Sequence, residues 1–120
     1  HKREGIYFST DKIFFDKKFK LIFLDTRFFR SKLLGEKGGY ISNTEDSATI
    51  LGKNQWLWLE DELNTEFDFL IIFSSIQIIP VDHPYEKWYN FPNDRNRLLG
   101  FLDKYRNKTI LFSGDIFFPK

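Results

Sequence analysis

Three short runs of apolar residues divide the chain, at residues 21–24, 69–73 and 109–112. Each run is bounded by polar residues and is too short to be a helix of ordinary length. Continuous apolar runs of this kind are typical of strands that are buried on both faces, as in a parallel sheet. The pattern therefore predicts three neighbouring buried strands.

Two segments between the runs carry the periodicity of amphipathic helices. The first helix is predicted over residues 52–65, and the acidic residues 60–62 are expected to point away from the core. The second is predicted to begin at Pro92, because proline suits the first turn of a helix. The apolar faces consist of Trp56, Leu59 and Leu63 in the first helix and of Leu98, Phe101, Leu102 and Tyr105 in the second.

The remaining segments are predicted to form a hairpin and loops. Residues 5–8 and 13–15 are β-prone and flank the polar residues 9–12, which predicts an N-terminal hairpin with its turn at 9–12. The three lysines at positions 17, 18 and 20 are interpreted as a solvated turn. Residues 26–50 are mostly polar and contain three glycines, so they predict a long loop. Loops of that length are uncommon unless they carry function or are poorly ordered.

Strands and helices alternate after the hairpin, which is the order of a mostly parallel sheet with helical crossovers. The fold class is therefore α/β. A chain of 120 residues is predicted to be one domain, or a piece of one, over residues 1–120. It begins at His1 without an initiator methionine, which indicates a fragment, a processed product or the visible part of something longer.

Composition excludes several classes of function. No apolar run approaches the roughly 20 residues of a membrane-spanning helix. The formal charge is +1, from 18 basic and 17 acidic side chains, which argues against a nucleic-acid binder. Cysteine is absent, so disulfides, thiolate zinc sites and cysteine nucleophiles are excluded, and nothing indicates the cellular compartment.

Each predicted strand ends at a cluster of polar residues. In a parallel sheet these ends share one edge, which is where open α/β sheets bind ligands. Carboxylates there suit a metal ion, and an arginine offers a planar fork for two phosphate oxygens. The clusters are Asp25-Thr26-Arg27, Ser74-Ser75 with Gln77 close behind, and Ser113-Gly114-Asp115.

Each of these residues also has an ordinary structural interpretation. Asp25 can cap a turn, Arg27 can be a surface ion-pair partner, and Asp115 can be a turn aspartate. His83 lies in a proline-rich loop, where solvent exposure or loop packing is the first interpretation and a lid over the cleft is the alternative. The convergence of three strand ends is the argument for a site.

A series of motifs, in order along nearly the whole chain, resembles the second half of PhoD-like (alkaline phosphatase D type) metallophosphatases. A single Asp-Thr-Arg would be weak support, whereas ordered motifs with sensible spacing are strong. The motifs are Arg3-Glu4-Gly5-Ile6-Tyr7-Phe8-Ser9, Leu24-Asp25-Thr26-Arg27-Phe28-Phe29-Arg30-Ser31, Leu51-Gly52, Gln55-Trp56-Leu57-Trp58-Leu59, Ser75-Ile76-Gln77, Trp88, Asn90-Phe91-Pro92, Arg95, Arg97-Leu98 and Ser113-Gly114-Asp115.

The resemblance implies part of a calcineurin-like metallophosphatase fold, in which a helix-flanked β-sandwich holds metal ions that activate a hydroxide. The ions would be divalent or trivalent, and their identity stays open. Asp115 matches a metal-site aspartate of the family. Arg27 would face the phosphate, and Arg30 is a weaker candidate for the same pocket. Asp25, Ser75 and Gln77 are expected to support the site.

Two departures from the family pattern limit what the chain is expected to do alone. Phe117 stands where the family carries a histidine, and a phenyl ring neither binds a metal nor donates a proton. The family's other ligand motifs would lie upstream of Arg3. The expectation is therefore part of a phosphoric ester hydrolase that is inactive by itself. The alternative is a degenerate phosphatase-like domain that serves as a structural or interaction subunit.

Half of a sandwich would leave unpaired strand edges and an open apolar face, both liabilities for a soluble monomer. The chain is therefore expected to pack against a missing N-terminal half of the domain or against a partner protein chain. A phosphate ester is the expected ligand if the protein is active.

Overall fold

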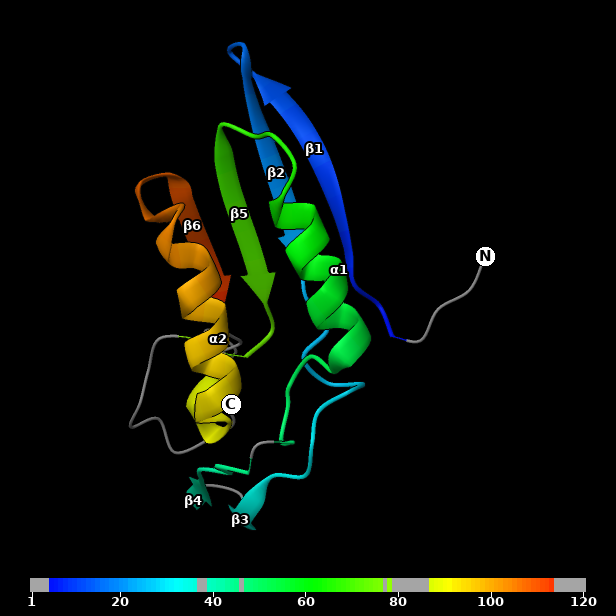
Figure 1. The fold of residues 1–120 in the computed structure, drawn as a ribbon, viewed down its shortest axis with the longest axis vertical. Coiled ribbons are helices and arrows are strands. Elements are labelled where there is room, and N and C mark those ends of the chain that lie inside the picture. Colours follow the sequence, from blue (N-terminus) through cyan, green and yellow to red (C-terminus); the bar gives the residue numbers. More distant parts are fainter. Residues whose placement is uncertain (1–4, 37–38, 46, 77, 79–86, 114–120) are drawn as a thin grey trace, which may run out of the picture.

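The computed structural model describes residues 5–36, 39–45, 47–76, 78 and 87–113. Its centre is a four-stranded sheet in the order β1-β2-β5-β6, in which β2, β5 and β6 are parallel and β1 is antiparallel to β2 (Figure 1). This arrangement confirms the predicted α/β class, with mostly parallel strands and an N-terminal hairpin. The strands are β1 (Phe8–Phe14), β2 (Lys17–Phe23), β5 (Phe69–Ser74) and β6 (Thr109–Ser113).

The N-terminal hairpin exists, but its turn is not where the sequence pattern placed it. Residues 9–12 lie inside β1, and the turn consists of Phe15 and Asp16. Both residues have positive φ, 51° and 66°, as two-residue hairpin turns of the I′ type require. The twist of this turn matches that of the flanking strands. The pairing of β1 with β2, which starts at Phe14↔Lys17, therefore offsets the conformational cost of a positive φ at Phe15.

The interpretation of the three lysines as a solvated turn is wrong, because all lie in β2. The Lys20 side chain is only 5% exposed, and its Nζ lies 3.1 Å from Glu62 Oε1 and 3.5 Å from Asp11 Oδ1. Ser9 Oγ donates to the same Glu62 oxygen at 2.6 Å. A buried ammonium group needs a paired carboxylate. Glu62 therefore turns toward the sheet instead of away from the core.

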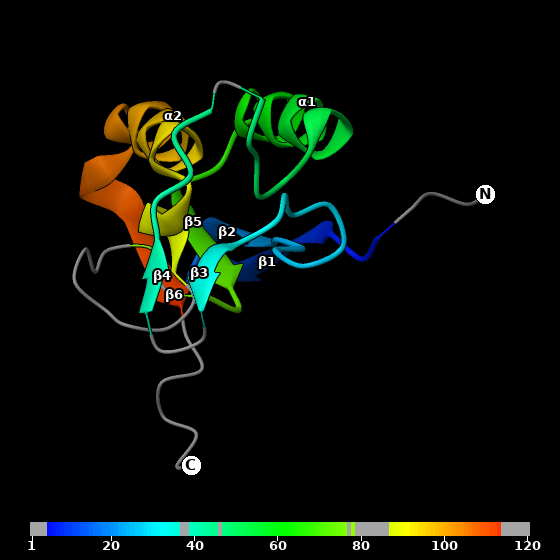
Figure 2. The ribbon, with the colours of Figure 1, turned by 90° about the horizontal axis from the view of Figure 1, so that it is seen from below.

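Two helices, α1 (Lys53–Leu63) and α2 (Pro92–Asp103), cover the same face of the sheet (Figure 2). They enclose the core together with the inward-facing residues of the strands. Of their predicted stripes, Phe101 is half-buried and these residues are buried: Trp56, Leu59, Leu63, Leu98 and Leu102. Tyr105 follows α2 and donates a hydrogen bond from its hydroxyl to the Leu63 carbonyl at 3.1 Å. Two short 3-10 helices, η1 (Trp88–Asn90) and η2 (Arg106–Lys108), flank α2 along the chain.

The segment that was predicted to be one long loop contains a second small sheet. Strands β3 (Leu34–Glu36) and β4 (Gly39–Ile41) pair antiparallel beyond the end of the main sheet (Figure 1). Gly35 has a φ of 85°, which glycine adopts at little cost. Gly35 and Gly39, two of the glycines that favoured a loop interpretation, thus lie in paired strands.

The face of the main sheet opposite the helices is apolar, and we call it the outer face. Ten of its outward-pointing residues are apolar: Phe8, Phe14, Phe19, Leu21, Phe23, Phe69, Ile71, Phe73, Ile110 and Phe112. Four of the rings stack across all four strands, in the order Phe8, Phe23, Phe73 and Phe112, with centroids 4.5, 4.4 and 5.3 Å apart. The prediction of burial on both faces holds for one face only, because residues such as Phe112 are 53% exposed on the other.

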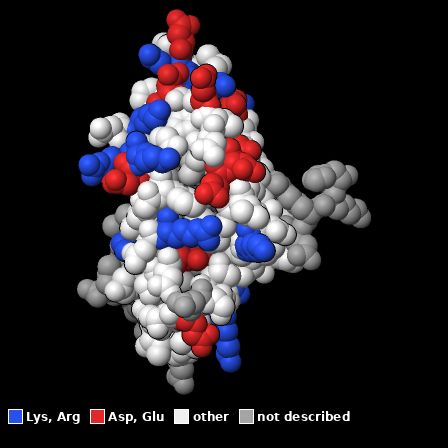
Figure 3. Space-filling view, viewed as in Figure 1, with Lys and Arg blue, Asp and Glu red and all other residues white. Residues whose placement is uncertain are grey.

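Charged side chains of both signs are interspersed over the helix-covered face (Figure 3). This distribution agrees with the near-zero net charge and leaves no large field of one sign on that face. Among the residues that the structure describes, no helix combines the length and apolar character needed to cross a membrane.

Candidate functional site

The three parallel strands end level with one another. Phe73 pairs with both Phe23 and Phe112, and Ser74 pairs with Ser113. All three strands point the same way, so the residues that follow them meet at one edge of the sheet (Figure 1). We call this the carboxyl edge. The structure thus brings together the ends of the predicted strands.

A short hydrogen bond joins the segment after β2 to the segment after β5. Thr26 Oγ1 and Ser75 Oγ lie 2.5 Å apart, and Thr26 is buried. The second segment is held in turn by Ser74, whose hydroxyl donates to the Ile76 carbonyl at 2.7 Å and accepts from Trp88 Nε1 at 3.0 Å. Ser75 itself is exposed at the edge.

Asp25 organises the turn that follows β2. Its Oδ1 accepts hydrogen bonds from the backbone N–H groups of Arg27 and Phe28 at 2.9 and 3.0 Å, and its Oδ2 accepts from Ile6 N–H at 2.8 Å. Partial burial raises the pKa of Asp25, but the hydrogen bonds from Phe28, Ile6 and Arg27 outweigh it and hold the pKa below its ordinary value. The carboxylate is thus engaged with the backbone.

The backbone of Asp25 is held by Gln55, a residue that the sequence did not single out as part of a site. Gln55 Oε1 accepts from Asp25 N–H at 2.8 Å, and its Nε2 donates to the Asp25 carbonyl at 2.9 Å. Nε2 also donates to the Leu51 carbonyl at 3.0 Å, and the side chain is fully buried. The available signal was a polar residue next to Trp56 on the buried side of a predicted helix.

Phe29 fixes the same turn from another side. A side chain at Gly5 would come within 2.5 Å of the Phe29 ring, and one at Gly52 would come within 2.9 Å of Phe29 Cβ. Both glycines have positive φ, 78° and 79°. The ring therefore lies between two backbone segments that only glycine allows so close.

Arg27 and Arg30 both lie on this turn. Arg27 is exposed and Arg30 is half-buried, and the Arg30 N–H donates to the Arg27 carbonyl at 3.3 Å. Just beyond, Ser31 N–H donates to the Thr49 carbonyl at 2.8 Å, and Ser31 Oγ accepts from Thr49 N–H at 2.9 Å. The turn is thus attached to the segment that leads into α1.

Asp94, which the sequence also did not single out, ties that segment to α2. Its Oδ2 accepts from Thr49 Oγ1 at 2.7 Å, from Ile50 N–H at 2.6 Å and from Trp56 Nε1 at 3.1 Å. An acidic residue in the first turn of a helix was the only signal in the sequence. The buried carboxylate links both helix starts to the carboxyl edge.

The other predicted site residues lie outside the described part of the chain. These are Gln77, His83, Asp115 and Phe117. Their roles stay predictions. Within the described residues, the carboxyl edge contains Asp25, Arg27, Arg30 and Ser75.

A family model described as PhoD-like phosphatase matches residues 5–118. The chain belongs to the PhoD-like phosphatase family. The match confirms the resemblance that the ordered motifs indicated, and it spans nearly the whole chain, including the carboxyl edge. Comparisons with curated proteins and with solved structures gave no match.

PhoD-like phosphatases are generally metal-dependent. Among the residues that the structure describes, no three His, Cys, Asp or Glu side chains lie together as a metal site would require. Asp25 is the carboxylate at the edge, and its two oxygens already accept three backbone hydrogen bonds. The described residues of this PhoD-like chain therefore do not fit a complete metal site.

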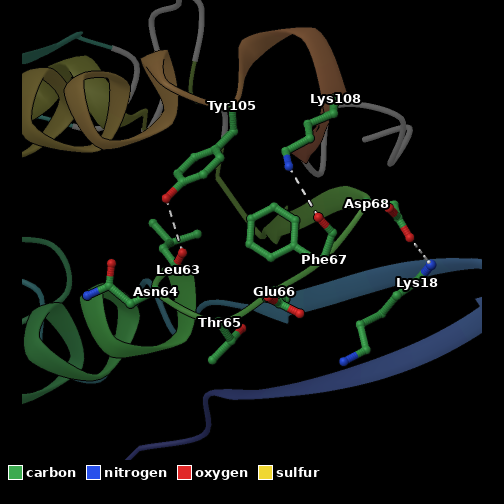
Figure 4. A pocket seen from close by; sticks show the side chains of 9 residues that line it. All are labelled: Lys18, Leu63, Asn64, Thr65, Glu66, Phe67, Asp68, Tyr105 and Lys108. Carbon is green, nitrogen blue, oxygen red and sulfur yellow. Dashed lines mark hydrogen bonds between the residues drawn. The ribbon is translucent and has the colours of Figure 1, made fainter.

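A separate open hollow of about 550 Å³ lies at the opposite, amino edge of the sheet (Figure 4). Two of its polar side chains bond within the protein: Asp68 Oδ2 accepts from Lys18 N–H at 2.7 Å, and Lys108 Nζ donates to the Phe67 carbonyl at 3.2 Å. The strand starts, not the strand ends, form this hollow. Its lining residues are Lys18, Leu63, Asn64, Thr65, Glu66, Phe67, Asp68, Tyr105 and Lys108.

Proposed function

We propose that the chain is the C-terminal portion of the catalytic domain of a metal-dependent phosphoric ester hydrolase and supplies its phosphate-binding edge. The observation that carries this proposal is the turn after β2, where Asp25 and Gln55 hold the backbone next to Arg27. In a family of phosphatases, an exposed arginine at the carboxyl edge suits a phosphate ester.

Arg27 is the residue that we assign to the phosphate. Its guanidinium group offers two parallel N–H donors that match two phosphate oxygens. Arg30 lies on the same turn and is the second candidate, while Ser75 and Gln77 support the neighbouring segment. Asp115 follows β6 by two residues and is proposed as a metal ligand. The rest of the ligand set would come from the N-terminal half of the domain or from a partner chain.

The outer face supports the need for such a second layer. Ten apolar side chains lie on one side of the sheet, and the stacked phenylalanines form a band across all four strands. Two sheets that pack face to face bury surfaces of this kind about 10 Å apart. We propose that a second β-sheet layer covers the outer face, as in a sandwich whose helices lie outside.

The test is hydrolysis by the full-length protein. It is assayed with a chromogenic phosphate monoester and diester, and its metal content is measured by elemental analysis. Arg27→Ala is expected to lower kcat/KM by about 100-fold, because a charge-assisted bidentate contact to the transferred group is lost. Arg106→Ala is the matched control, since Arg106 is exposed at the amino edge and pairs with Asp103 at 3.6 Å.

Three outcomes decide between the interpretations. Turnover with bound metal that depends on Arg27 but not on Arg106 supports the hydrolase. Turnover that is unchanged in the Arg27→Ala variant refutes the assignment of the phosphate contact to Arg27. A folded full-length protein that binds neither metal nor phosphate ester refutes the hydrolase and favours a structural subunit.

A further inference from the structure

Gln55 occupies a position where the helix would ordinarily carry an apolar side chain. It lies on the buried side of α1 and is fully enclosed, beside Trp56 and Leu59. A buried amide costs free energy unless its donors and acceptor are all used. Here the amide oxygen accepts one hydrogen bond and the amide nitrogen donates two. The burial of Gln55 therefore serves a specific contact and not the general packing of the core.

The hydrogen bonds between Gln55 and Asp25 take the place of those that a neighbouring strand would make. The last backbone bond between the β2 segment and β5 is from Leu24 N–H to the Phe73 carbonyl at 3.0 Å. Asp25, one residue further on, receives its partners from Gln55, which accepts from its N–H and donates to its carbonyl. The side chain thus extends the regular hydrogen bonding of the sheet to the first residue of the turn.

Fixing Asp25 also fixes Arg27. The Asp25 carboxylate accepts from the N–H groups of Arg27 and Phe28. Both the backbone and the side chain of Asp25 are therefore fixed, and they fix the backbone from which the Arg27 side chain extends. A long, exposed arginine gains from such a base, because less freedom is lost when it meets a phosphate. Hydrogen bonds thus connect Gln55, on the buried side of α1, through Asp25 to Arg27 at the carboxyl edge.

We propose that Gln55 is a positioning residue that presets the Arg27 turn to receive a phosphate group. This inference rests on the proposed function. It assigns to a buried helix residue an effect on phosphate affinity that operates only through Arg27. Hydrogen-bond geometry carries it, since the bonds of Gln55 go to backbone groups of Asp25 and Leu51.

The experiment is a double-mutant cycle in the full-length protein, with inorganic phosphate as the probe. Gln55→Met keeps side-chain length and removes both hydrogen bonds to Asp25. It is expected to weaken phosphate binding by about tenfold, and to raise KM for a phosphate ester more than it lowers kcat, because the lost bonds hold the turn. Asn54→Met, at an exposed position on the same helix, is the matched control.

The decisive comparison is made in the Arg27→Ala background. If Gln55 acts through Arg27, then Gln55→Met has no further effect on phosphate affinity once Arg27 is gone. Equal effects in both backgrounds would show a general structural role and overturn the inference, while leaving the proposed function intact. A wild-type protein that does not bind phosphate would overturn both the inference and the proposed function. This outcome is recognised in the first measurement, before any variant is compared.

A second variant covers the case in which Gln55→Met does not fold. Asp25→Ala removes the carboxylate that accepts from the N–H groups of Arg27, Phe28 and Ile6. Amide hydrogen exchange at Arg27 and Phe28 is then expected to accelerate by about tenfold, with the amides of α1 unchanged. Unchanged exchange at these two amides, with weakened phosphate binding, would contradict the proposed route through the turn.

Discussion

Asp25 shows how one side chain can decide the shape of a turn. It accepts three backbone hydrogen bonds from two different segments, so its ionised form is worth more in the folded chain than in the unfolded one. Its lowered pKa expresses the same preference. A group of this kind stabilises the fold at pH values above its ordinary pKa and loses that contribution as the pH falls through the folded value.

The pH dependence of stability should therefore change when Asp25 is replaced. At pH 7, Asp25→Asn is expected to lower the free energy of unfolding by about 1 kcal/mol, since the bond to Ile6 is lost. As the pH falls below the ordinary pKa of an aspartate, about 4, and then through the lower pKa of folded Asp25, the wild type loses this contribution, and the two proteins should converge. Urea unfolding at pH 7 and pH 3 measures the difference. Asp103→Asn, at an exposed ion pair, should show no such convergence.

The sequence could place Asp25 but not the residues that hold it. Asp25 follows an apolar run directly, and the rule that strand ends share an edge is enough to bring it near Ser75. Gln55 and Asp94 act over 30 and more positions along the chain. The partners of Gln55, and some of those of Asp94, are backbone groups, which carry no residue-specific signal. Only the packing of both helices on one face shows what they contact.

At the scale of elements, the hairpin and the lysines of β2 show where local patterns mislead. Polar residues 9–12 resemble a turn when the strand is considered alone. In the folded chain, Ser9 and Asp11 face Glu62 and Lys20, which form a small ion-pair network on the helix side of the sheet. Long-range pairing thus outweighed local propensity, as it often does in strands.

The two helices offer a matched pair of glycine substitutions. Gly52 precedes α1 with a φ of 79°, and an added Cβ would lie 2.9 Å from Phe29 Cβ. Gly52→Ala is therefore expected to destabilise the protein by about 2 kcal/mol, from backbone strain and from the displaced ring. Gly100 lies inside α2 with nothing within 4 Å of an added Cβ. Gly100→Ala should instead stabilise the protein by roughly 0.5–1 kcal/mol.

Thermal and urea unfolding of the two alanine variants test this contrast directly. Similar effects of the same sign would contradict the close contact between Phe29 and Gly52. Because Phe29 lies on the turn that carries Arg27, the Gly52 variant should also weaken phosphate binding, whereas the Gly100 variant should not.

At the scale of the whole molecule, the apolar runs in the sequence and the apolar outer face have the same origin, because the runs supply side chains to both faces of the sheet. Each of the three predicted strands contains a run that is apolar on both sides, which predicts burial on both sides. In the described part of the chain, α1 and α2 both cover the same side (Figure 2). The sequence could therefore predict the sheet and the need for a second layer, but not which protein segment provides it. Large exposed apolar patches often mark interaction surfaces, and this is the reason for proposing a second layer on the outer face.

The outer face gives the last prediction, because it is exposed in this chain and should be buried in the complete assembly. Ile110 is 52% exposed on the outer face, and Leu57 is 49% exposed on α1. In the full-length protein, Ile110→Lys should lower the free energy of unfolding by about 3 kcal/mol, because it would bury an unpaired charge between two layers. Leu57→Lys should change it by less than about 0.5 kcal/mol, as at an ordinary surface position.

The 120-residue chain on its own provides the complementary measurement. There, Ile110→Lys should reduce self-association and the binding of a hydrophobic dye, because it interrupts the exposed apolar surface. Equal tolerance of lysine at positions 57 and 110 in the full-length protein would show that nothing packs on the outer face. The second layer, and with it the proposed source of the remaining metal ligands, would then have to be abandoned.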